Sequence, residues 1–262
     1  MKVPGFGWIH QRQAQENQSS SNRFIELDIF RGIAIVYMMF HHVLWDLDYF
    51  GIWPLNPHLY QFNQLVPLMF FVLIGICLSI SFNKKQDYSN RFLEKHLLKR
   101  GLWIFGLGMI ITAVTLVFMP ERPILFGVLH CIGFSIILSI PLLKLKTLVL
   151  FPGLIMVLLG VLMAQFSVEN PTVVHLLVGL HPIGFWQYTI DYFPLFPWFG
   201  VALLGVFLGN IFYKDGQRQF HFPDLSGNRS ISFLSWMGKH SLEIYLLHQP
   251  VIAGILGLYI TM

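Results

Sequence analysis

Long apolar stretches separated by polar connections constrain the fold of this chain more than any other feature. Each approaches the roughly 20 helical residues that cross a hydrocarbon core of about 30 Å. Of the 262 residues, 55% are hydrophobic and 11% are charged, whereas soluble domains average about 25% charged residues. The sequence therefore predicts an all-α integral membrane protein, a single bundle of about seven transmembrane helices. The expected spans are residues 29–49, 62–82, 99–119, 123–143, 147–165, 194–213 and 231–249.

The first 27 residues are polar and differ from the rest. The segment MKVPGFGWIHQRQAQENQSSSNRF contains no apolar region followed by a small-residue cleavage site, so we do not expect a cleaved signal peptide. We expect residues 1–27 to form a polar cytoplasmic tail and residues 28–262 to form one transmembrane domain. The basic residues are spread over several connections rather than gathered in one patch, so no nucleic-acid partner is expected.

The positions of the basic residues predict the topology. All but Arg122 of the 17 Lys and Arg residues fall in alternate connections between the expected spans. By the positive-inside rule the N-terminus is cytoplasmic and the C-terminus lies outside. An eighth span within residues 171–190 would move four basic residues outside, so we expect an outer loop with an interfacial helix there. The predicted location is the cytoplasmic (inner) membrane, which the chain crosses several times in contact with membrane lipids.

The first expected span, RGIAIVYMMFHHVLWDLDYFG, carries ionisable side chains toward its far end. His42 follows Arg31 by eleven residues, which at about 100° per residue places the two within about 20° of one face and about 16 Å apart along the axis. Asp46 is four residues beyond His42, the spacing at which helix side chains meet and at which a carboxylate can orient an imidazole. The pair His42 and Asp46 is therefore a candidate general base.

Simpler roles stay open for these residues. Arg31 can extend to the cytoplasmic headgroups, and Asp28 can cap the helix N-terminus. His42 and Asp46 can instead form a structural hydrogen bond between helices. Ionisable residues inside membrane spans are costly and tend to mark function, which favours a catalytic interpretation of the pair.

Further polar residues fall at outer depth when the topology is applied. His130 is early in the fourth expected span, Asp191 is at the opening of the sixth, and His248 is at the outer end of the seventh. We expect these three to support His42 and Asp46. The chain has no HExxH or similar ligand spacing, so no metal is expected.

Five segments resemble a known family in their order along the chain. They are DIFRGIAIVYMMFHHVLWDLDYFG, LMFFVLIGICLSIS, GVLHCIG, DYFPLFPWFG and SLEIYLLHQP. Together they resemble the bacterial membrane proteins grouped with the heparan-α-glucosaminide N-acetyltransferase catalytic domain, from about residue 23 to the C-terminus. The spacing of Arg31 and His42 is also similar to that in other transmembrane acyltransferases, including acyltransferase family 3. The resemblance implies O- or N-acyl transfer from cytoplasmic acetyl-CoA, or another acyl-CoA, to an acceptor beyond the membrane.

The chain differs from the lysosomal enzyme of this family, and these differences limit which acceptor and which catalytic residue the resemblance implies. The chain lacks the luminal domain and some helices of the lysosomal enzyme, so a glycosaminoglycan acceptor is not carried over. We expect an amino sugar or a glycan. In the lysosomal enzyme the catalytic histidine is placed in the loop after the first helix, which makes His58 a rival to His42. The donor phosphates would bind Arg31 and the basic second connection through Lys95, Lys99 and Arg100.

Several alternatives stay open from the sequence. The acceptor can attack the thioester directly, or the acyl group can pass through a covalent acyl-histidine. A proton-coupled transporter of small solutes is the alternative function, because it too uses buried His, Asp and Glu. The acceptor, the acyl chain length and assembly as a homodimer are not fixed by the sequence.

Overall fold

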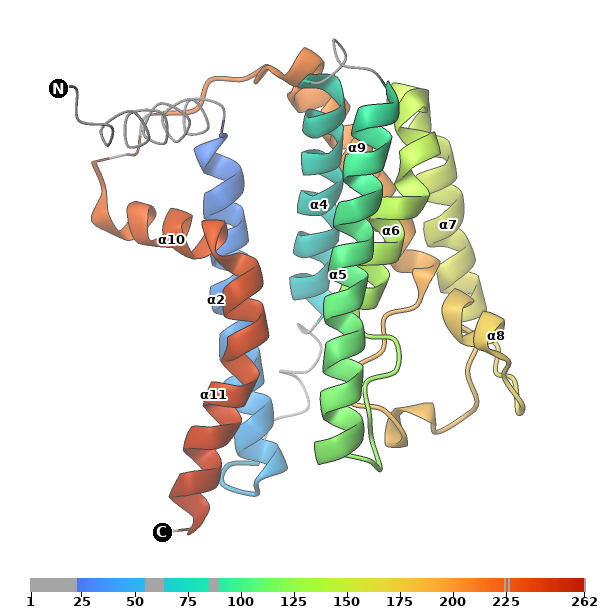
Figure 1. Cartoon of the computed structure of the whole chain (residues 1–262), viewed down its shortest axis with the longest axis vertical. Helices are drawn as coiled ribbons and strands as arrows, with labels where there is room; N and C mark the ends of the chain where they lie inside the picture. Colours follow the sequence, from blue (N-terminus) through green and yellow to red (C-terminus); the bar gives the residue numbers. More distant parts are fainter. Residues whose placement is uncertain (1–22, 55–63, 85–89, 224, 226, 262) are drawn as a thin grey trace, which may run out of the picture. The chain divides into compact units, whose positions relative to one another are not determined.

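The structure is a computed structural model that describes residues 23–54, 64–84, 90–223, 225 and 227–261. The described part of the chain is helical, with two isolated β-bridges and no strand (Figure 1). It divides into two compact units. Unit 1 contains residues 1–54 and 223–262, and unit 2 contains residues 55–222.

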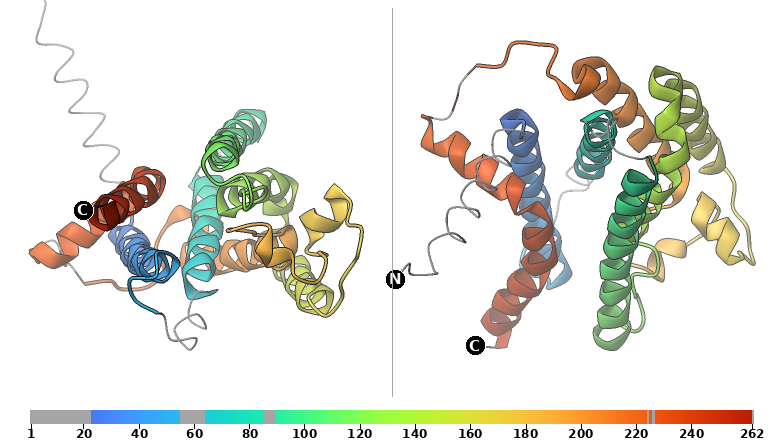
Figure 2. Two further views of the ribbon diagram at one scale, coloured as in Figure 1. Left: turned by 90° about the horizontal axis from the view of Figure 1, so that it is seen from below. Right: turned by 45° about the horizontal axis from the view of Figure 1, so that its top comes forward.

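Unit 1 contains the helices α2 (Ile25–Tyr49), α10 (Arg229–Lys239) and α11 (Ser241–Thr261). Helix α10 crosses α2 at very short range, because a β-carbon built on Gly32 would overlap the backbone oxygen of Leu234, and one on Gly238 would overlap that of Asp28. Helices α2 and α11 lie side by side and run in the same direction (Figures 1 and 2). Two helices far apart in the sequence therefore form one interface in unit 1.

Unit 2 contains five longer helices that pack in pairs through glycines. They are α4 (Leu65–Lys84), α5 (Asn90–Phe118), α6 (Val128–Leu142), α7 (Leu150–Met163) and α9 (Leu195–Phe212). Gly75 of α4 lies against the backbone of α9, Gly133 of α6 against that of α5, and Gly160 of α7 against Pro197 of α9. Small residues let helix backbones approach closely where water provides no driving force for association.

The chain reverses between α6 and α7. The connection is the 3₁₀ segment η2 (Leu143–Val149), in which Lys146 has a φ of 52° and a non-helical ψ of −121°. Gly133 of α6 contacts Gly101 and Phe105 of α5, whereas Gly153 and Gly160 of α7 contact α9. The order of these contacts makes α6 antiparallel to α5 and α7 antiparallel to α9. Helices α6 and α7 run in opposite directions on either side of η2 and form a hairpin (Figure 1).

Shorter elements connect the helices of unit 2. Helix α8 (Val173–Val178) lies in the stretch where the sequence predicts an interfacial helix, and Thr172 caps its N-terminus. It is followed by η3 (Phe185–Gln187), and η4 (Lys214–Gly216) follows α9. The residue pair Phe126 and Tyr192 forms a parallel bridge between the α5–α6 connection and the segment before α9.

Six helical stretches among the described residues are long and apolar enough to cross a membrane. The chain is therefore a multi-pass membrane protein. Two of the expected spans, 123–143 and 147–165, fall in one continuous helical stretch, Val128–Met163, which counts as a single candidate by length and composition. Helix α2 begins at Ile25 rather than 29, and α5 begins at Asn90 rather than 99.

The expected seventh span, 231–249, has the wrong bounds. Helix α10 ends at Lys239, His240 takes a non-helical conformation, and α11 starts at Ser241. The candidate span is Ser241–Tyr259. The break arises because Gly238 is fixed against the backbone of Asp28 while α10 crosses α2. The correction moves His248 away from the end of its helix and into its first half.

Candidate active site

The interface between α2 and α11 in unit 1 brings two histidines together. The imidazole rings of His42 and His248 are 4.7 Å apart between centroids and meet edge to face at an interplanar angle of 84°. His248 is 8% exposed, and His42 is partly buried. The structure thus pairs two of the residues that the sequence singled out, although 206 positions separate them in the chain.

Each ring is held by its own helix through one nitrogen. The Nδ1 atom of His42 lies 2.9 Å from the carbonyl oxygen of Met38, and Nδ1 of His248 lies 2.6 Å from that of Tyr245. A carbonyl oxygen only accepts, so each Nδ1 carries the hydrogen, and in a neutral ring Nε2 keeps the lone pair. Nε2 of His248 is buried without a hydrogen-bond partner. In each neutral ring Nε2 is therefore the nitrogen that can accept a proton.

Asp46 lies beside this pair but is bonded to another residue. Both of its carboxylate oxygens accept hydrogen bonds from Nε2 of Gln249, at 2.8 and 3.1 Å. Asp46 is 1% exposed, and its charge interacts with His42. The sequence predicts that Asp46 fixes the tautomer of His42, but in the structure the Met38 carbonyl occupies the nitrogen that a tautomer-fixing partner would bind.

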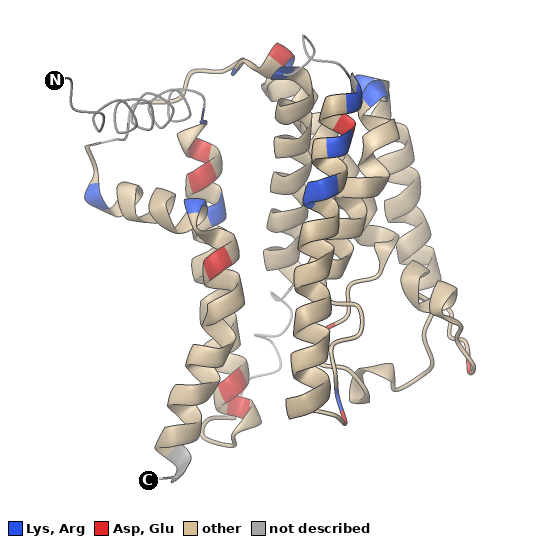
Figure 3. Ribbon diagram, viewed as in Figure 1, with Lys and Arg blue, Asp and Glu red and all other residues tan. Residues whose placement is uncertain are grey.

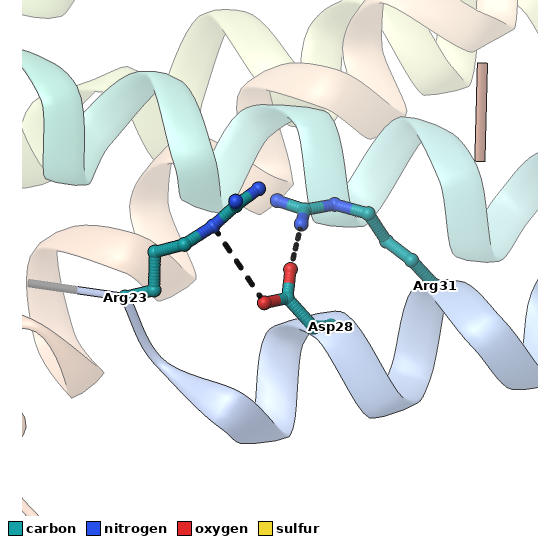
Figure 4. Close-up of polar contacts among 3 residues, drawn as sticks. All are labelled: Arg23, Asp28 and Arg31. Carbon is teal, nitrogen blue, oxygen red and sulfur yellow. Dashed lines mark hydrogen bonds and ion pairs between the residues drawn. The ribbon is translucent and has the colours of Figure 1, made fainter. Parts of the chain in front are cut away.

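Arg31 lies on the same helix, closer to its N-terminus, and forms an ion pair. Its Nη1 atom is 2.6 Å from Oδ1 of Asp28, and Nε of Arg23 is 3.8 Å from the other oxygen of that carboxylate (Figure 4). The Asp28 side chain is 3% exposed and the Arg31 side chain 24%. The N-cap residue of α2 is Phe24, so Asp28 is not the helix cap but a buried anion paired with arginine.

His130 lies in unit 2 and uses both ring nitrogens within that unit. The backbone N–H of Gly127 donates to Nδ1 at 3.2 Å, so Nε2 carries the hydrogen and faces Oγ1 of Thr112 at 3.3 Å. The Thr112 hydroxyl in turn donates to the carbonyl oxygen of Ile124 at 2.6 Å. His130 is 1% exposed. In this arrangement it ties the α5–α6 connection to α5.

Asp191 also lies in unit 2, in the segment before α9, and its side chain contacts the start of α6. Its Oδ2 atom accepts a hydrogen bond from the backbone N–H of Val128 at 3.2 Å. Burial raises the pKa of Asp191 to about 6, and the bond from Val128 opposes that shift. The neighbouring residue Tyr192 donates its hydroxyl to the carbonyl oxygen of Leu176. Asp191 is therefore a carboxyl group that changes charge near neutral pH.

The basic residues expected to bind the donor lie on α5 rather than in a connection. Lys95, Lys99 and Arg100 are exposed on its first turns (Figure 3). Nearby, Lys144 of η2 pairs with Glu94 at 2.8 Å. His58, the rival catalytic residue, lies outside the described residues. In the described part of the chain, no group of three or more His, Cys, Asp or Glu side chains is arranged to hold a metal ion.

Sequence reasoning missed two polar partners, Gln249 and Thr112. Gln249 follows His248 directly in the chain, but its contact with Asp46 depends on knowing that α2 and α11 are neighbours. Thr112 lies in an apolar helix at no spacing that links it to His130. Neither residue therefore carried a signal in the sequence.

The helices and the buried ionisable pair define the class of the molecule: a multi-pass membrane protein with histidines inside a membrane-spanning unit. Residues 23–250 match the family described as heparan-alpha-glucosaminide N-acetyltransferase, catalytic, and the chain belongs to this family. Membership implies acyltransferase activity in general and favours it over proton-coupled transport. Comparison with curated proteins and with solved structures gives no match.

Proposed function

We propose that this protein transfers an acetyl or other acyl group from cytoplasmic acyl-CoA to an amino sugar or glycan outside the membrane. The observation that carries the proposal is the pair of His42 and His248, each with Nδ1 on a backbone carbonyl and Nε2 left for proton transfer. Family membership supplies the reaction class. We place the protein in the inner membrane of a bacterium.

A transmembrane reaction requires a defined topology, and two features support seven crossings. Helices α2 and α11 run in the same direction in unit 1, so the number of crossings between them must be odd. The hairpin of α6 and α7 supplies the additional crossing when its legs are counted separately. With the basic residues inside, the N-terminus is cytoplasmic and the C-terminus lies outside.

The chemistry follows from the free nitrogen of His42. Nε2 of His42 removes the proton from the amine or hydroxyl of the acceptor, which attacks the carbonyl carbon of the thioester. The carbon–sulfur bond breaks, and the coenzyme A thiolate leaves and takes up a proton. The Asp46 carboxylate stabilises the positively charged imidazolium that His42 becomes when it takes this proton. An acyl-histidine intermediate is the covalent variant of the same step, and His58 remains the rival base.

The donor is held by charge at the cytoplasmic side in this proposal. Arg31 is the candidate in unit 1, where it would exchange Asp28 for a phosphate, and Lys95, Lys99 and Arg100 are the candidates in unit 2. Guanidinium and ammonium groups form strong, charge-assisted hydrogen bonds with phosphate. The separation of about 16 Å between Arg31 and His42 along α2 is comparable with the length of a pantetheine arm.

Transfer in sealed liposomes tests the proposal. Radiolabelled acetyl-CoA is enclosed with the reconstituted protein, and a panel of amino sugars and glycans is supplied outside. We expect label to appear on an external acceptor. Detergent-solubilised protein serves as the control for sidedness, because both substrates then reach it from one solution. If no acceptor is labelled in either format, while the folded protein neither retains nor binds coenzyme A in native mass spectrometry, the proposed function is wrong.

A further inference from the structure

The hydrogen bonds between Gln249 and Asp46 connect α11 to the site on α2. The amide Nε2 atom lies 2.8 and 3.1 Å from the two carboxylate oxygens, whereas the amide oxygen of Gln249 is buried without a partner. A carboxylate has no hydrogen to give, so the reversed amide would set oxygen against oxygen. The orientation of the Gln249 amide is therefore fixed by the charge of Asp46.

A carboxylate that is almost completely removed from water needs donors to stay ionised. Asp46 is 1% exposed, and the groups that face it are the Gln249 amide from α11 and the His42 ring from α2. The described hydrogen bonds to its oxygens both come from Gln249. The charge beside His42 thus depends on a residue of another helix.

We propose that Gln249 is a positioning residue that keeps the Asp46 carboxylate ionised beside His42. The inference rests on the proposed function, in which that charge stabilises the His42 imidazolium. In this role Gln249 acts through Asp46. Its removal would leave Asp46 to take up a proton, and the imidazolium would lose its counter-charge.

Kinetics of matched variants test whether Gln249 acts through Asp46. Gln249→Met keeps the length of the side chain and removes the donor. We expect it to lower kcat by the same factor as Asp46→Asn, with the KM for acetyl-CoA within a few-fold of wild type. The double variant should be no slower than either single one, because residues acting through one group are not additive. Gln219→Met, at an exposed glutamine of unit 2, is the control and should match wild type. Multiplying effects in the double variant would overturn the proposal.

Infrared difference spectroscopy supplies a measurement that does not depend on transfer. At neutral pH we expect the difference spectrum of Gln249→Met minus wild type to show an additional carbonyl band of a protonated carboxylic acid, and we expect that band to be lost when Asp46→Asn is added. If Gln249→Met lacks the band, Gln249 does not keep Asp46 ionised. If the band behaves as expected while wild-type protein transfers no acyl group, the proposed function fails and the role of Gln249 in holding the charge stands.

A double variant in which the acid and the amide exchange places distinguishes the effect of the hydrogen bond from the effect of where the negative charge lies. Asp46→Asn combined with Gln249→Glu restores an amide–carboxylate contact but moves the negative charge to α11. We expect the thermal stability lost in Gln249→Met to return and kcat to stay low. Recovery of both would mean that the contact between the helices is sufficient, and the role of the Asp46 charge would be refuted.

Discussion

A substitution at His42 removes the ring nitrogen Nε2, the atom of this residue that can take part in proton transfer. Nδ1 donates to the carbonyl oxygen of Met38, so Nε2 is the nitrogen left for proton transfer. His41, its neighbour, has its ring centroid 6.4 Å from that of His42 and lies about 100° around the helix. The two adjacent histidines therefore leave α2 in different directions, and the His42 ring is the one paired with His248.

Replacing His42 with alanine should lower kcat by roughly 10²- to 10⁴-fold, the usual loss on removing a general base. Affinity for acetyl-CoA should stay within a few-fold, because the base acts in the transition state and not in holding the donor. His41→Ala is the matched control and should retain near-normal turnover. If His58→Ala abolishes transfer while His42→Ala does not, the base is His58.

Asp191 makes stability depend on pH. Burial raises its pKa to about 6 in the folded protein, above the value of about 3.9 for an unfolded chain. The folded state then binds the proton more tightly, so the stabilisation is complete below about pH 4 and is lost as the pH rises through about 6. Asp191→Asn resembles the protonated form and keeps an acceptor for Val128.

We expect the thermal midpoint of wild type to fall between pH 5 and pH 7 and that of Asp191→Asn to change less. At pH 7 the variant should be the more stable protein, by up to about 3 kcal/mol. Glu169→Gln, at an exposed carboxylate of the same unit, should retain the pH dependence of wild type. Parallel curves for Asp191→Asn and wild type would contradict the assignment.

At the scale of the elements, two glycines allow the backbones of α2 and α10 to cross in close contact. Gly32 and Gly238 each lie where a side chain would overlap backbone atoms of the other helix. Backbone cannot move aside as the end of a flexible side chain can. The crossing also sets where α10 ends, and therefore where α11 begins.

Gly238→Ala should destabilise the protein by about 1 to 3 kcal/mol, the usual cost of overpacking. The measurement is the thermal midpoint in detergent. Gly106→Ala is the control, because Gly106 is in the middle of α5 and a β-carbon there would meet nothing within 4 Å. That variant should be neutral or slightly stabilising, since alanine favours helix. Equal midpoints for Gly238→Ala and wild type would show that the crossing can open.

The sequence predicts α4 and α9 well because each is a continuous apolar run with polar residues at its ends. The predicted start of α5 is too late. The exposed Lys95, Lys99 and Arg100 lower the hydropathy of the first turns, although Leu93 and Leu97 in the same turns are buried. The sequence also joins α10 to α11, because hydropathy averaged over a window does not detect a break that depends on packing against α2. The residue types of His42 and His248 within apolar spans are enough to single them out, although the bounds predicted for the helix of His248 are wrong, whereas Gln249 requires knowledge of the helix pairing.

At the scale of the whole molecule, the direction in which each helix crosses the membrane decides which residues face the cytoplasm and which face outside. Because the chain reverses at η2, the predicted topology places η2 on the cytoplasmic side and the segment after α7 outside. Leu145 is exposed in η2, and Asn170 is exposed after α7. Single cysteines at these positions report whether α7 crosses.

In a background lacking Cys77 and Cys131, Leu145→Cys should be labelled from the cytoplasmic side and Asn170→Cys from outside. The measurement is modification by an impermeant maleimide in intact cells and in inverted vesicles. Labelling of both cysteines from one face would mean that α7 does not cross, and the topology with seven crossings would be abandoned.

Donor binding through exposed charge should depend on salt. Replacing Lys95, Lys99 and Arg100 with glutamine should weaken binding of acetyl-CoA and reduce its sensitivity to ionic strength, because salt screens exposed charges. Titration at two salt concentrations measures both effects. The same replacement at Lys144, which is paired with Glu94, is the control. Unchanged affinity at low salt would place the anchor elsewhere.

The pairing of α2 with α11 also sets when the candidate site can form during synthesis. Asp46 and Gln249 are 203 positions apart, so at 5–20 residues per second the ribosome needs roughly 10 to 40 s to make the second after the first. For that interval His42 and Asp46 are already in the membrane without their partners. Helix α11 is made after α2 and supplies Gln249, so a nascent chain that stalls within unit 2 contains His42 and Asp46 but not the contact that joins α11 to them.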